Sequence, residues 1–113
     1  MSEKQGISTY REFWPYYLRE HRMPATRALH LAGTGVSTAL LAAAAFNASL
    51  LLLLAAVLAG YGPAWVAHFT VEGNRPATFR YPLWSLISDY RMAATWLAGG
   101  LDRELKRAGI ETQ

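Results

Sequence analysis

The chain has 113 residues, a formal net charge of +3 and no cysteine, with 52% hydrophobic and 17% charged residues. Its length predicts one domain, and the lack of cysteine excludes disulfides and thiolate metal sites. Because residues 28–71 contain no Asp, Glu, Lys or Arg, the composition predicts a membrane protein. Basic residues flank this block, and we expect them to bind anionic lipid and not nucleic acid.

The first predicted helix runs from about Tyr10 to Arg22. Thr9 and Glu12 fit a capping box at its start. Pro15 is expected to bend this helix or to delay its start, and Pro24 to end it and to open the next helix. The aromatic side of the helix suits the plane of the membrane interface, whereas packing on a soluble core is the alternative.

The uncharged block, residues 28–71, is too long for one membrane span. As a single helix it would measure about 66 Å, against a hydrocarbon core of about 30 Å. Its most polar point is Asn47–Ser49, midway between His30 and His68, so a turn there predicts a two-span hairpin with both histidines at one depth. Small residues along both spans allow close helix packing or a homodimer, and Pro63 is expected to kink the second span.

After the hairpin, Pro82 predicts a helix from Leu83 to about Ala98, closed by Gly99-Gly100. Its charged residues make it an interfacial or re-entrant helix, and a last helical piece follows from Leu101 to Ala108. The sequence therefore predicts an all-α membrane hairpin with flanking interfacial or re-entrant helices. We expect one domain over residues 1–113, with flexible ends at 1–8 and 110–113.

Arginines flank both ends of the hairpin, at Arg22, Arg27, Arg75 and Arg80, and the turn carries none. The positive-inside rule then predicts that both termini are cytoplasmic. The expected location is an integral membrane one, either the bacterial inner membrane or, in a eukaryote, the endoplasmic reticulum.

All three histidines of the chain, His21, His30 and His68, fall at this same predicted membrane end. Glu72 follows His68 by four residues, which suits chelation of one ion on one helical face. Imidazole and carboxylate without thiolate suit Fe(II), Zn or Mn, and two histidines with one carboxylate are the pattern of non-haem Fe(II) oxygenases. Structural histidines, or two haem ligands at His30 and His68, are the alternatives to this metal site.

Four blocks of the sequence, Tyr17–His21, Pro24–His30, Gly60–Glu72 and Asn74–Phe79, resemble the MPO-like family of small integral membrane proteins. The characterised member of this family is the fungal 2-hydroxy fatty acid dioxygenase of phytosphingosine breakdown. The resemblance covers residues 10–92. It implies Fe(II)-dependent α-oxidation, in which O2 converts a 2-hydroxy fatty acid to a fatty acid one carbon shorter.

The family's catalytic metal ligands map onto His21, His30, His68 and Glu72, although a single His21 stands where the fungal enzyme has a His-His doublet. Four protein ligands would leave an octahedral ion only two positions, which a chelating 2-hydroxy acid would fill at the expense of O2. We therefore expect one of the four, His21 or Glu72, to bind the metal only weakly or to support the other ligands without binding the metal itself.

Three further polar residues are candidates for the site. Arg75, with Asn74 beside it, is expected to bind the substrate carboxylate, or Arg75 anchors the chain to lipid phosphate. Asp89 either orients a histidine by accepting its N–H or pairs with an arginine. The acyl chain is expected along the apolar hairpin. The competing functions are a non-catalytic membrane protein that binds lipid or assembles with a partner, and a bis-histidine haem protein.

Overall fold

A computed structural model describes residues 6–110, and every regular element within this range is helical, as predicted. Contacts divide the chain into two compact units. We call Met23–Pro76 the hairpin unit, and Met1–Arg22 together with Ala77–Gln113 the terminal unit. That residues 1–113 form one domain stays a prediction.

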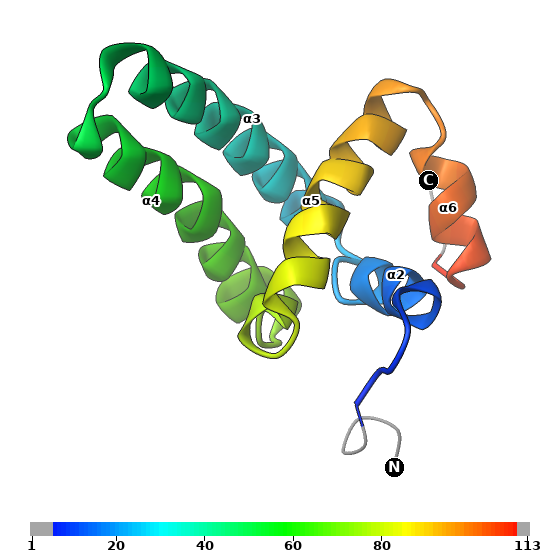
Figure 1. Cartoon of the computed structure of the whole chain (residues 1–113). Helices are drawn as coiled ribbons and strands as arrows, with labels where there is room; N and C mark the ends of the chain where they lie inside the picture. Colours follow the sequence, from blue (N-terminus) through cyan, green and yellow to red (C-terminus); the bar gives the residue numbers. More distant parts are fainter. Residues whose placement is uncertain (1–5, 111–113) are drawn as a thin grey trace. The chain divides into compact units, whose positions relative to one another are not determined.

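The hairpin unit consists of two long antiparallel helices, which lie side by side in Figure 1. Helix α3 spans Pro24–Asn47, and α4 spans Leu50–Val66 and continues as a π-helix, η1, over Ala67–Glu72. Ala48 turns the chain with a left-handed φ of 47°, and the Ser49 side chain caps α4. The predicted turn and the start at Pro24 are confirmed, because both signals act on the adjacent backbone.

Small residues bring the backbones of α3 and α4 close together. A Cβ on Gly33 would lie 2.9 Å from the carbonyl oxygen of Ala59. Pro63 has no N–H for that carbonyl, so the oxygen is free of its usual intrahelical partner. One turn further along α3, the Ser37 hydroxyl donates to the Ala56 carbonyl oxygen at 2.7 Å. The kink expected at Pro63 stays a prediction.

Both long helices expose apolar side chains along most of their length. Only 17% of the most apolar window of each helix is buried, unlike the core helix of a soluble domain, which is mostly buried. The large exposed side chains include the following residues: Val36, Leu41, Phe46, Leu50, Leu51, Leu54, Val57 and Leu58. Both helices are long and apolar enough to cross a membrane, and such an open apolar surface favours membrane association.

Among its described residues, the terminal unit has three α-helices and one short 3-10 turn. They are α2 (Tyr10–Arg19), η2 (Ala77–Phe79), α5 (Pro82–Leu97) and α6 (Leu101–Arg107). The Thr9 hydroxyl caps α2 by accepting the Glu12 N–H. The helix continues through Pro15, so its start is not delayed, and a bend at Pro15 stays a prediction. The helix ends at Arg19 instead of Arg22.

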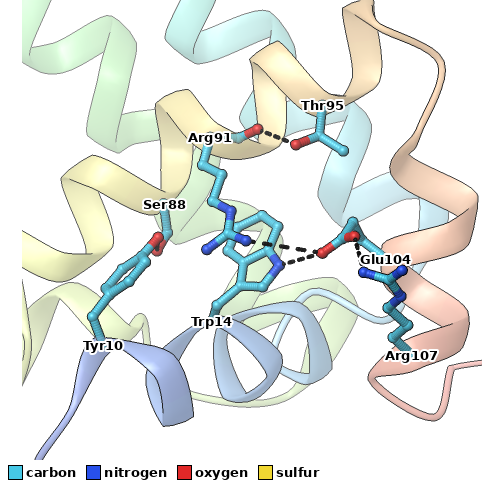
Figure 2. Close-up of polar contacts among 7 residues, drawn as sticks. All are labelled: Tyr10, Trp14, Ser88, Arg91, Thr95, Glu104 and Arg107. Atoms are coloured by element: carbon cyan, nitrogen blue, oxygen red, sulfur yellow. Dashed lines mark hydrogen bonds and ion pairs between the residues drawn. The ribbon is translucent and has the colours of Figure 1, made fainter.

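A cluster of polar and aromatic groups joins α2, α5 and α6 within this unit (Figure 2). The Trp14 indole N–H donates to the Glu104 carboxylate at 2.8 Å, and the Arg91 guanidinium lies 4.1 Å from the centre of the Trp14 ring. Arg91 also pairs with Glu104 at 4.0 Å. Tyr10 and Ser88 share a hydrogen bond of 2.9 Å between α2 and α5. These contacts fix α2, which carries Tyr17 and ends two residues before His21.

The ends of α5 and α6 lie where local signals place them. Pro82 opens α5, and Gly99 and Gly109 follow α5 and α6 with φ of +82° and +84°. That α5 is an interfacial or re-entrant helix stays a prediction. Of the ends that we expected to be flexible, residues 1–8 and 110–113, only 6–8 and 110 are described. There the Ile7 N–H donates to the Tyr81 hydroxyl at 2.8 Å.

Candidate metal centre

The hairpin brings His30 of α3 against His68 of η1. Their Nε2 atoms are 3.2 Å apart, and their ring planes are inclined by 83°. Both side chains are buried. The hairpin turn at residues 48–49 explains this pairing, because the two histidines are almost equally far from it along antiparallel helices.

The 3.2 Å between the two Nε2 atoms suits two ligands of a single ion. Nitrogen ligands about 2.1 Å from a metal, and about 90–109° apart, are roughly 3.0–3.4 Å from each other. Ligands on opposite sides of a metal would be about 4 Å apart at the same bond length. The pair therefore fits adjacent positions on one ion.

Asn74 fixes the His68 ring from behind. The His68 Nδ1 lies 2.7 Å from the Asn74 side-chain oxygen, and the Asn74 backbone N–H donates to the His68 carbonyl oxygen at 2.9 Å. The chain returns to His68 because Gly73 closes the π-helix with a left-handed φ of 74°. Because a side-chain oxygen accepts, this contact favours the tautomer with the proton on Nδ1 and the lone pair on Nε2, the atom that faces His30.

His21 is held in a comparable way at the end of α2. Its Nδ1 lies 2.6 Å from the Tyr17 carbonyl oxygen, and its ring stacks on the Tyr17 ring with centroids 4.1 Å apart. This carbonyl belongs to the last turn of α2, where carbonyls commonly accept from side chains. The contact favours the tautomer with the proton on Nδ1 and the lone pair on Nε2, the form that can bind a metal.

Asp89 supports Tyr17. The Tyr17 hydroxyl donates to the Asp89 carboxylate at 2.5 Å. Burial, followed by the nearby Asp89 charge, raises the pKa of Tyr17 well above its ordinary value of 10.0, so the hydroxyl keeps its proton. Within the terminal unit, Asp89 therefore holds the Tyr17 hydroxyl and helps to fix the Tyr17 ring, which stacks against His21. A direct role for Asp89 behind a histidine stays a prediction.

His21, His30 and His68 together could hold one metal ion. Each offers one ring nitrogen as a possible ligand, and all three side chains are buried. Three imidazoles without a thiolate fit Fe(II), Zn or Mn, as expected from the sequence.

Glu72 lies outside this group of three. Its carboxylate accepts the Met23 N–H at 2.6 Å, at the start of α3, where the capping residue provides no side-chain bond of its own. A negative charge there also interacts favourably with the helix dipole. Glu72 thus joins the end of η1 to the beginning of α3, and its role as a metal ligand stays a prediction.

The contacts of Tyr17 and Asn74 with the histidines were not anticipated from the sequence. A histidine four residues after Tyr17, at the end of a predicted helix, is the signal that could have indicated the first contact. Asn74, expected at the substrate, is instead bonded to His68. Arg75, also expected there, is exposed, and binding of substrate by either residue stays a prediction.

Comparison with known families matches residues 7–101 to a family described as 2-hydroxy-palmitic acid dioxygenase Mpo1-like. Comparison with curated proteins and with solved structures found no match. The family match includes all three histidines, Glu72 and the whole hairpin. With most of its length matched, the chain belongs to the Mpo1-like family.

Proposed function

We propose that the protein is an Fe(II)-dependent dioxygenase that shortens 2-hydroxy fatty acids by one carbon. The group of three buried histidines in a chain of the Mpo1-like family is the observation that carries this proposal. In the reaction the bond between C1 and C2 breaks, and O2 accepts four electrons. The 2-hydroxy acid and O2 yield a fatty acid one carbon shorter, CO2 and water.

In this proposal His21, His30 and His68 hold the ion through their Nε2 atoms. Glu72 remains with the Met23 amide and is the labile member of the four predicted ligands. Three protein ligands leave three octahedral positions, enough for a chelating 2-hydroxy acid and O2. Bound Fe(II) would supply Lewis acidity toward the hydroxy acid and a site of electron transfer to O2.

The remaining residues bind and orient. The Tyr17 carbonyl and Asn74 keep the Nδ1 protons of two histidines in place, so that the Nε2 lone pairs stay directed at the ion. Arg75, next to Asn74, binds the substrate carboxylate. The acyl chain lies along the exposed apolar side of the hairpin, within the bilayer. The protein spans the membrane twice, with both termini and the metal centre on the cytoplasmic side.

The bis-histidine haem alternative is less compatible with the His30–His68 geometry. A porphyrin plane must pass between two axial imidazoles, which places their nitrogens about 4 Å apart, whereas these lie in hydrogen-bond contact at 3.2 Å. A non-catalytic membrane protein would need no metal at all.

Metal analysis and turnover test the proposal. Protein purified without chelator should contain iron near one equivalent, show no Soret band, and convert 2-hydroxyhexadecanoate to pentadecanoate. His68→Ala should lose both iron and turnover, whereas Thr70→Ala, two residues away on an exposed position, should keep both. Haem absorbance would favour the haem protein, and metal-free wild-type protein would favour a non-catalytic role. Full iron retention by His68→Ala would exclude the proposed ligand set.

A further inference from the structure

Thr26 carries a buried hydroxyl that the contacts described so far leave unexplained. Its side chain has 0% exposure, and its Oγ1 has no hydrogen-bond partner within the described residues. Thr38 and Thr70 each donate to the carbonyl four residues earlier, whereas Thr26 lies in the first turn of α3, where the residue four positions earlier, Arg22, is outside the helix. A buried hydroxyl without a partner is destabilising, so its presence calls for a ligand or another explanation.

The position of Thr26 connects it with the metal centre. Thr26 precedes His30 by four residues on α3, so the two side chains share one face of the helix. The buried residues of α3 include Thr26, His30 and Gly33, and Gly33 lies against the Ala59 backbone of α4. Thr26 is therefore on the inward face of the hairpin, one turn from a histidine of the candidate centre.

We propose that the Thr26 hydroxyl hydrogen-bonds an oxygen of the substrate head group when a 2-hydroxy fatty acid binds at the metal centre. This inference rests on the proposed function. The hydroxyl can donate to a carboxylate oxygen or exchange a hydrogen bond with the 2-hydroxyl group. Thr26 is then a positioning residue for the substrate, and the cost of its unpaired hydroxyl in the free protein is recovered on binding.

A pair of substitutions separates this role from a structural one. Thr26→Val keeps the branched shape and removes the hydroxyl, and Thr26→Ser keeps the hydroxyl. Without substrate, Thr26→Val should unfold at a higher temperature than wild type, because it removes an unpaired buried polar group. Its affinity for 2-hydroxyhexadecanoate should fall by about tenfold, the equivalent of one hydrogen bond. Thr26→Ser should bind with close to wild-type affinity.

Thr38→Val, on an exposed position of the same helix, is the matched control and should leave affinity unchanged. Binding of hexadecanoate, which lacks the 2-hydroxyl group, identifies the contacted oxygen. If Thr26→Val lowers the affinity for both acids equally, the hydroxyl contacts the carboxylate. If it lowers the affinity for the hydroxy acid alone, the hydroxyl contacts the 2-hydroxyl group. A lower unfolding temperature for Thr26→Val, or unchanged affinity, would overturn the inference. Failure of the wild-type protein to bind iron or 2-hydroxyhexadecanoate would instead remove the proposed function, and this inference with it.

Discussion

At the scale of single residues, His21 and His68 are prepared for metal binding in the same way. In each, Nδ1 contacts an oxygen acceptor, the Tyr17 carbonyl in one case and the Asn74 side chain in the other. An acceptor at Nδ1 selects the tautomer in which Nε2 carries the lone pair. The candidate centre thus depends on groups that are not themselves ligands.

Asn74→Leu should weaken metal binding. Without the side-chain oxygen, the His68 ring loses its tautomer and orientation, and partners of this kind are typically worth about 10–100-fold in metal affinity. Competition with a chelator of known affinity measures the effect. Asn74→Asp, which keeps an acceptor, should bind metal at least as tightly as wild type. The same Asn→Leu change at Asn47, in the hairpin turn, is the matched control. Unchanged affinity in Asn74→Leu would show that the contact does not orient the ring.

Tyr17→Phe should cost stability and leave the metal in place. The change removes the 2.5 Å hydrogen bond to Asp89, and a hydrogen bond to a charged group contributes about 1.5–3 kcal/mol. The ring and the backbone carbonyl that hold His21 remain. Tyr10→Phe, which removes a neutral bond to Ser88, should cost about 1 kcal/mol. Denaturant unfolding in detergent, with metal content measured beside it, checks both. Loss of metal from Tyr17→Phe would show that Asp89 and the hydroxyl act on His21 itself.

Sequence reasoning anticipated the three histidines but not their supports. The histidines could be placed because a hairpin with its turn at Asn47–Ser49 sets His30 opposite His68. The contact of Asn74 with His68 depends on the left-handed turn at Gly73 and on the π-helix before it. Neither has a signal in hydrophobic periodicity, so the bonds of Glu72 to Met23 and of Asn74 to His68 were not anticipated.

At the scale of elements, the start of α3, the hairpin turn, and the bounds of α5 and α6 were predictable, because the relevant residues act on their own backbone. Pro24 and Pro82 open α3 and α5, and Gly99 and Gly109 adopt a positive φ after α5 and α6. The early end of α2 was not predictable in this way. The helix was expected to reach Arg22 because Pro24 was the expected end signal, but the last turn is already closed at Glu20. His21 therefore lies outside the helix, where its ring reaches the Tyr17 carbonyl.

Helix packing in the hairpin makes opposite predictions for two glycines of α3. Gly33→Ala should destabilise the hairpin by about 1–3 kcal/mol, because its Cβ would press on the α4 backbone. Gly35→Ala meets nothing within 4 Å and should be neutral or stabilising by up to about 1 kcal/mol from helix propensity. Unfolding in mixed micelles measures both. Since Gly33 follows His30 by less than one turn, Gly33→Ala should also lower metal affinity. Equal stability of the two variants would contradict the close approach of α3 and α4.

At the scale of the whole molecule, the distribution of arginines predicts a topology that cysteine labelling can test. The chain has no cysteine, so Ala48→Cys introduces a single thiol at the hairpin turn, where a side chain is already accepted at positive φ. Under the positive-inside rule this turn faces outward. A membrane-impermeant maleimide should label Ala48→Cys in intact cells, and should label Ser8→Cys, on an exposed position before α2, only after permeabilisation. The reverse pattern would move the histidines to the outer face, and labelling of both sites in intact cells would exclude a hairpin that crosses the membrane.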